Sequence, residues 1–311
     1  MTASAHLILL SAVAAVAFGC SLLCGAALFL GRKWLGGLAP AAQARVLLAV
    51  ALAPALVSTT LLSAMVFDLA VRRCEVHRCL LHGSAVRSPL VVGLAALFAL
   101  RLGRQGWVAL RALRHSRSLA RALEGVASPG GAGSRIVPID EPQAFVVGLF
   151  RPRMYLSQGL LRVTDPRDLE AVTEHERSHI QRRDPLRRFI ASLALAFHLP
   201  RSASAIERRL AAAQESAADA DAARVLGDPP RIARALVKLA RLRVARLPLA
   251  AGILGSDLEF RVRELLGPAT RPDRPAPLLL VAVATAGFAA SLLVADPIHT
   301  AFESLVRLLA G

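Results

Sequence analysis

The sequence predicts a mainly α-helical membrane protein with about four transmembrane helices and a cytoplasmic α+β domain that contains a small β-sheet. Apolar residues make up 55% of the 311 residues, and the mean hydropathy of +0.50 is high for a soluble protein. These residues gather in long runs, whereas the middle of the chain is strongly basic. Two histidines four residues apart lie in that basic part.

The apolar runs predict an N-terminal membrane region, residues 1–103, and one further span near the C-terminus. The run from Leu7 to Leu30 has no charged residue, and roughly 20 such residues cross the hydrocarbon layer as a helix. No Lys or Arg precedes this run, so we expect a retained span rather than a cleaved signal peptide. The third run is short, and its flanking arginines must extend toward the lipid surface. The predicted spans cover about residues 7–30, 46–70, 87–103 and 277–296, and a short tail, 297–311, follows.

Basic residues set the predicted orientation. The stretch from Arg101 to Arg274 holds most of the net charge of +16, and such residues stay on the cytoplasmic side. We therefore expect a cytoplasmic domain at 104–276, in a multi-pass protein of the cell membrane whose N-terminus lies outside. The arginines in the outer loop, 71–88, go against this rule. We assign the basic surface to contact with membrane lipid rather than nucleic acid, because aromatic residues amount to only 5% and no nucleic-acid-binding module is present.

Two pairs of cysteines call for different interpretations. Cys20 and Cys24 lie inside the first predicted span, where they act as small apolar residues. Cys74 and Cys79 lie in the outer loop, where we expect either a disulfide or, together with neighbouring histidines, a second metal site.

The cytoplasmic part predicts short strands followed by helices. Apolar and basic residues alternate at helical spacing over 104–125, which is typical of a helix on the membrane surface, and the glycine-rich stretch 127–134 predicts a flexible connector. Pro166, after the candidate caps Thr164 and Asp165, marks the start of the histidine-bearing helix. Three strands are expected at 135–139, 143–150 and 153–157, and later helices at about 202–226, 230–245 and 256–266.

The apolar stretch 189–199 is too short to cross a bilayer. A single crossing there would also put the later acidic residues on the opposite side of the membrane from the histidine pair. We therefore expect a core or interfacial helix, and we read His198 as a helix-end histidine rather than a metal ligand.

His175, Glu176 and His179 form the motif H-E-x-x-H on a predicted helix. Residues four apart in a helix project about 40° from one another, so both imidazoles can bind one tetrahedral zinc ion. Glu176 lies one position further round the helix, within reach of a water molecule on the metal. The motif predicts one zinc ion per chain, with Glu176 as the catalytic base.

A catalytic zinc ion needs a third protein ligand from another helix. In the stretch AAAQESAADADAARVLG, Glu215 is the candidate ligand, and Asp219, four residues on, lies on the same face. We expect the Asp219 carboxylate to fix the tautomer of one zinc histidine. The alternative is an acidic stripe in solvent that pairs with nearby arginines.

This residue set predicts metal-assisted hydrolysis of an amide bond, in which Glu176 accepts a proton and later delivers it to the leaving nitrogen. The segment 143–150 offers either an edge to which an extended substrate peptide adds or a buried structural strand.

The chain resembles the membrane gluzincin peptidases of the BlaR/MecR type, and more distantly the HtpX and CAAX-protease group. The likeness lies in FVVGLFRPRMYLSQGLL, HERSHIQRRDPL, ESAAD and RVRELL, between about Phe145 and Leu266. It implies a zincin-like protease domain in which His175, His179 and Glu215 bind zinc. Glu176 would then be the catalytic base, and the Asp219 carboxylate would contact one of the zinc-bound histidines. Its sensor members respond to an extracellular event, and a transcriptional repressor is inactivated.

The chain departs from that pattern at two places. Ala220 stands where relatives often have arginine, so we expect a transition-state contact from elsewhere, with Arg224 as the candidate. Residues 297–311 are too few for a sensor domain, so direct sensing of β-lactams is not expected.

The sequence therefore predicts a membrane zinc metalloendopeptidase that cuts protein substrates, such as a repressor or a membrane protein, at the cytoplasmic membrane face in regulatory proteolysis. The alternative is an idle membrane adaptor or scaffold with a structural zinc site. The presence of Glu176 argues against it, because a structural site needs no base.

Overall fold

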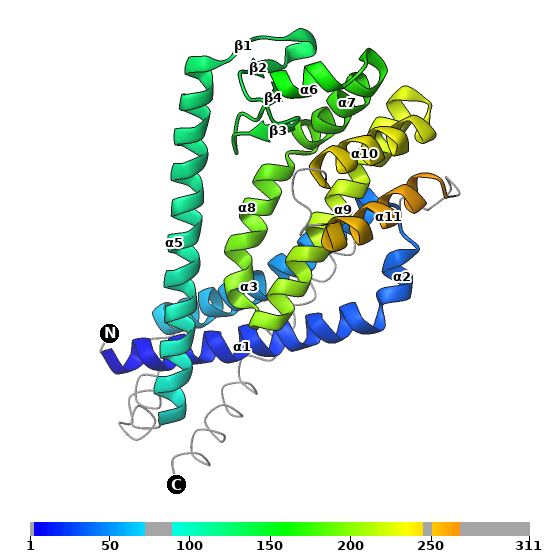
Figure 1. The fold of residues 1–311 in the computed structure, drawn as a ribbon. Helices are drawn as coiled ribbons and strands as arrows, with labels where there is room; N and C mark the ends of the chain where they lie inside the picture. The colour runs from blue at the N-terminus through cyan, green and yellow to red at the C-terminus, as the bar shows by residue number, and fades with distance from the viewer. Residues whose placement is uncertain (1–2, 72–88, 245–250, 268–311) are drawn as a thin grey trace.

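The computed structural model describes residues 3–71, 89–244 and 251–267 (Figure 1). Within this part, two stretches are long and apolar enough to cross a membrane. They are Leu10–Leu30 in helix α1 (Ala3–Leu30) and Pro40–Thr60 in helix α3 (Pro40–Val71). The short helix α2 (Arg32–Gly36) connects α1 to α3. These helices agree with the first two predicted spans, although α3 begins six residues before its predicted span.

The third predicted span and the predicted surface helix are one continuous helix, α5 (Pro89–Val126). The expected break near residue 103 is absent, because the change from apolar to basic side chains does not interrupt the backbone hydrogen bonds. Among the described residues, no stretch of α5 reaches the length and hydropathy of the two candidate spans. Figure 1 shows α5 crossing α1 and continuing to the β-sheet. The predicted count of four spans is not confirmed.

A pair of helices, α8 (Asp184–Ala194) and α9 (Pro200–Leu226), connects the apolar helices to the rest of the protein. The tip of this pair is a 3-10 turn, η3 (Leu195–Phe197), which ends at the fully buried His198. The His198 ring lies 3.3 Å from Ser21 Oγ of α1 and 3.2 Å from the Ala51 carbonyl of α3. The stretch 189–199 is thus a core element, as predicted, and His198 contributes to packing among helices.

The sheet has four strands, in the order β1-β2-β4-β3. Strand β4 pairs in parallel with β2 and antiparallel with β3, and Gly148, with φ of 111°, forms the turn after β3. The predicted connector is partly ordered, since it contains β1 and a 3-10 turn, η2 (Gly131–Gly133). The strands are β1 (Ser128–Pro129), β2 (Arg135–Val137), β3 (Ala144–Val147) and β4 (Arg153–Ser157).

Alternation along β4 gives the sheet two apolar faces. Tyr155 packs on Leu123 of α5, whereas Met154 and Leu156 pack on the opposite face against Val172 of helix α7 (Pro166–Arg182). The short helix α6 (Gln158–Val163) follows β4 directly. The sheet is therefore held between α5 and α7, which fixes the position of the histidine-bearing helix.

Local signals in the sequence explain where the later helices begin and end. Asp165 caps α7 by accepting a hydrogen bond from the Asp168 N–H, and Gly227, with φ of 66°, ends α9. Two further helices follow: α10 (Pro229–Val244) packs on α7 and α9, and α11 (Ala251–Leu265) packs on α9 and α10.

Several predictions fall outside the described residues. These are the last span, 277–296, the tail, 297–311, and the outer-loop pair Cys74 and Cys79.

Candidate metal centre and its cavity

Helix α7 brings the two histidines of the H-E-x-x-H motif together. His175 and His179 lie one helical turn apart, and their Nε2 atoms are 3.2 Å from each other. The rings stand nearly perpendicular, with an interplanar angle of 85°. Both Nε2 atoms therefore point to one place beside the helix.

Glu215 of α9 completes a group of three metal-binding side chains. Its Oε2 atom lies 3.5 Å from His175 Nε2, and its Oε1 atom lies 3.7 Å from His179 Nε2. One ligand atom from each residue lies within 4.8 Å of the others. Zinc bonds of about 2.1 Å in a tetrahedron put ligand atoms roughly 3.4 Å apart, so the spacing and the donor types fit a zinc ion.

The Nδ1 atom of each histidine contacts a buried carboxylate. His175 Nδ1 lies 2.8 Å from Asp219 Oδ1, and His179 Nδ1 lies 2.9 Å from Asp184 Oδ2. Both aspartates are 1% exposed. A carboxylate on Nδ1 keeps the proton there and leaves Nε2 as an electron-pair donor.

Sequence reasoning did not single out Asp184. A signal was available, because the sequence RRDP ends one helix and starts the next. Arg183 adopts a left-handed conformation with φ of 54°, which folds the first residue of α8 back onto the preceding helix.

The electrostatics of the centre favour a cation. Burial works against the charged His175 imidazole, but the Asp219 and Glu215 carboxylates outweigh it and raise its pKa to about 10. Burial likewise opposes ionisation of Glu215 and Asp219, yet the surrounding imidazoles and arginine lower the pKa of both carboxyls. Because the carboxylates stay charged and attract protons to the imidazoles, the same field attracts a divalent ion.

Two arginines orient the acidic side chains of the centre. Arg261 of α11 donates two hydrogen bonds to Asp219, at 2.6 and 2.8 Å, and its Nη1 atom lies 3.7 Å from Glu215 Oε2. Arg188 of α8 donates a 2.8 Å hydrogen bond to Glu215 Oε1. Both guanidinium groups therefore restrict the carboxylates to the geometry that faces the histidines.

The structure does not bring Arg224 to the centre. Its side chain is 74% exposed and pairs with Asp221 at 3.3 Å. Arg224 follows Asp219 by five residues, which turns it about 140° away round the helix. The arginines that reach the centre are Arg188 and Arg261, and the sequence patterns assigned a role to neither side chain.

A cavity of about 240 Å³ opens onto the centre. Glu176 lines it together with His175, Glu215, Asp219 and Arg261. The segment before β3 contributes Pro142, Gln143 and Ala144. The apolar part of its lining comes mainly from α10, with Ile232, Ala235, Leu236, Leu239 and Ala240.

Comparison with known proteins agrees with this arrangement. The model of the family described as peptidase family M48 matches residues 114–275, which lie within the predicted domain 104–276. A protease HtpX homolog from Pelotomaculum thermopropionicum is 29% identical over 170 residues, which cover 42% of this chain and 60% of that protein. The chain thus spans less than two thirds of the length of this relative. No solved structure matches the chain.

These matches support the HtpX side of the resemblance, and neither distinguishes the BlaR/MecR type. Together with the two apolar helices, they indicate a membrane protein. The match to the family model covers more than half of the chain, so the chain belongs to peptidase family M48.

Proposed function

We propose that this protein is a membrane zinc metalloendopeptidase that hydrolyses peptide bonds of protein substrates. The observation that carries the proposal is the convergence of His175, His179 and Glu215 beside a cavity that Glu176 also lines. A site that only stabilised the fold would close all four positions round the metal with protein ligands. Within the described residues, three ligands converge and an open cavity adjoins them.

The residues of the chain divide the work of hydrolysis. A zinc ion bound by the three ligands would polarise the scissile carbonyl and lower the pKa of a water molecule beside it. Glu176 accepts the proton of that water and then delivers it to the leaving nitrogen. Arg261, held by Asp219, also lines the cavity, and its proposed role is to donate a hydrogen bond to the oxygen that gains negative charge.

Strand β3 supports a mode of substrate binding. Within the part of the chain that the structure describes, only β4 pairs with this strand, so it forms an edge of the sheet, and the residues just before it line the cavity. An extended peptide can add to this edge through backbone hydrogen bonds, with its next residues directed to the metal centre.

We further propose that the domain works at the cytoplasmic face of the cell membrane, in regulatory proteolysis of a repressor or a membrane protein. The basic composition of the residues after the first spans supports this orientation. The resemblance to the BlaR/MecR type motivates the regulatory role.

The test compares the wild type with Glu176→Gln in the same cells. Both proteins should contain about one zinc ion per chain, because Glu176 is not a ligand. Only the wild type should deplete a co-expressed candidate substrate or cut casein in detergent. Equal depletion by both proteins would exclude this site as the source of proteolysis.

A further inference from the structure

Helix α10 separates two hollows within the described part of the chain. Ile232, Leu236 and Leu239 line the cavity of the metal centre, whereas Ala233 and Val237 line a second groove. Neighbouring positions on a helix point about 100° apart, so these two sets form different stripes of one helix. A molecule in the second groove would lie roughly 10 Å from the metal cavity, which is the width of the helix between them.

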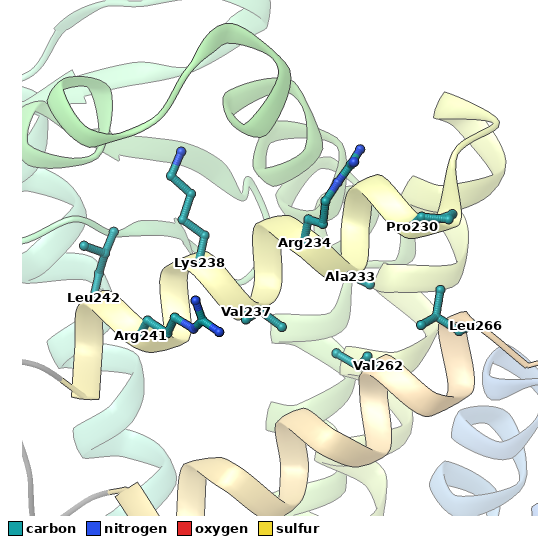
Figure 2. Close-up of a pocket in the computed structure, with 9 residues that line it drawn as sticks. All are labelled: Pro230, Ala233, Arg234, Val237, Lys238, Arg241, Leu242, Val262 and Leu266. Carbon is teal, nitrogen blue, oxygen red and sulfur yellow. The ribbon is translucent and has the colours of Figure 1, made fainter.

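The second groove lies between α10 and α11 and has a volume of about 640 Å³ (Figure 2). This volume is within the roughly 300–1,000 Å³ typical of ligand sites. Most of its lining is apolar, and in Figure 2 Ala233 and Val237 of α10 face Val262 and Leu266 of α11. The apolar lining residues are Pro230, Ala233, Val237, Leu242, Val262 and Leu266.

Three cationic side chains along α10, Arg234, Lys238 and Arg241, also line this groove, and in Figure 2 those of Arg234 and Lys238 point away from α11. Their spacing of four and three residues puts them on one face, in a row roughly 10 Å long. Lys238 is engaged already, since it lies 2.5 Å from Asp168 of α7. The Arg234 side chain is 72% exposed, and its Nη2 atom lies 3.9 Å from the Asp228 carboxylate, so this contact neutralises its charge only weakly.

We propose that this groove binds an acidic amphipathic helix of a protein substrate, an inference that rests on the proposed function. Apolar side chains of such a helix would fill the groove, and its carboxylates would pair with Arg234 and Arg241. These two arginines are seven residues apart, which is two turns, so acidic residues at the same spacing on a partner helix match them. A row of cations suits a row of carboxylates better than the single phosphate of a lipid headgroup.

The groove would then act as a second contact for substrates, apart from the cleavage site. A helix held there keeps the adjoining polypeptide at high local concentration near the metal cavity. The contact therefore determines which proteins are cut, without entering the chemistry of the bond.

The test measures binding to the full chain carrying Glu176→Gln, so that no probe is cut, in phosphatidylcholine nanodiscs. The probes are two fluorescein-labelled helical peptides of roughly 18 residues with the same leucine face. One carries glutamates spaced four and three residues apart, and the other carries lysines there. The wild-type groove should bind the glutamate peptide at least about tenfold more tightly than the lysine peptide.

Reversing the charges of the groove arginines should make the protein prefer the lysine peptide over the glutamate peptide. Arg234→Glu with Arg241→Glu should weaken binding of the glutamate peptide by about tenfold or more and strengthen binding of the lysine peptide. The control, Arg117→Glu with Arg121→Glu on the exposed part of α5, makes the same change in net charge and should leave both affinities within about twofold. If the charge-reversed variant fails to fold, the double variant Arg234→Gln with Arg241→Gln should still weaken binding of the glutamate peptide.

Three results would overturn the proposal. The wild type could bind both peptides equally or not at all, or the groove variants could lose no more affinity than the control. If phosphatidylglycerol in the nanodiscs displaced the glutamate peptide from the wild-type groove, and the groove variants did not show this displacement, the groove would be assigned to lipid instead. Because no hydrolysis is measured, these results are separate from the comparison of Glu176→Gln with the wild type in proteolysis.

Discussion

The Oδ2 atom of Asp184 lies 2.9 Å from Nδ1 of His179, although the two residues belong to successive helices. Asp184 is buried, with Arg182 and Arg187 3.7 and 3.8 Å from its carboxylate. The contact ties the start of α8 to the metal centre, so the helix that packs on the apolar spans also orients a candidate zinc ligand.

The substitution Asp184→Asn should lower zinc affinity by about tenfold, within the roughly 10–100-fold range for such partners of ligand histidines. Asparagine keeps the shape but loses the negative charge that favours a cation. Competition with a chromophoric chelator measures the affinity. Asp221→Asn is the matched control, because Asp221 contacts Ser178 of the same helix without touching a histidine, and an equal loss there would contradict the assigned role.

Without metal, the protein should lose stability as the pH rises from about 6.5 to about 10. The pKa of His175 is raised to about 10 in the folded state, against an ordinary value of 6.5. The folded state therefore binds a proton that the unfolded state releases, and this stabilisation is complete below pH 6.5 and disappears as the pH rises through 10. Thermal unfolding of the chelated protein between pH 6 and 10 measures it.

The control for this pH dependence is His175→Asn, whose unfolding temperature should change less over the same range. A chelated wild type that became more stable from pH 7 to 10 would contradict the geometry of His175 between its two carboxylates.

Arg261→Lys should reduce kcat by about 10²-fold while zinc is retained, since lysine cannot bridge Asp219 with two hydrogen bonds and also reach the cavity. Arg224→Lys should leave kcat within about twofold, because Arg224 is exposed and far round α9. Steady-state cleavage of a peptide found to be a substrate separates kcat from KM. The opposite ranking of the two variants would show that the wrong arginine has been placed at the centre.

Gly159→Ala should destabilise the protein by more than about 3 kcal/mol. A Cβ atom at this position would lie 1.9 Å from the Asp140 carbonyl oxygen, so the turn after β4 would have to move. Gly125→Ala, near the end of α5, meets no atom within 4 Å and should be neutral or stabilising by up to about 1 kcal/mol. Thermal unfolding of the two variants side by side decides whether this contact is as close as described.

Local patterns in the sequence were enough to predict much of this protein. Hydropathy marked α1 and α3, and Asp165 and Pro166 marked the start of α7, because caps and breakers act within a few residues. The i, i+4 spacing also paired His175 with His179, since one helical turn brings such residues together wherever the helix lies.

Other features depend on contacts between distant segments. Arg261 reaches Asp219 only because α11 folds back over α9, which no local pattern encodes. Asp184 approaches His179 through a left-handed residue, where helical spacing no longer applies. The change from apolar to basic residues near residue 103 suggested a helix boundary. Helix α5 nevertheless continues, because the backbone hydrogen bonds of a helix form in apolar and in aqueous surroundings alike.

The most direct measurement of the central claim is zinc K-edge X-ray absorption, with zinc content, on the wild type, Glu176→Gln and Glu215→Ala. We expect about one zinc ion per chain in the first two proteins, bound by two imidazoles and a carboxylate at about 2.0–2.2 Å. Glu215→Ala should lose most of its zinc. Full zinc content and an unchanged spectrum in Glu215→Ala would show that Glu215 is not a zinc ligand.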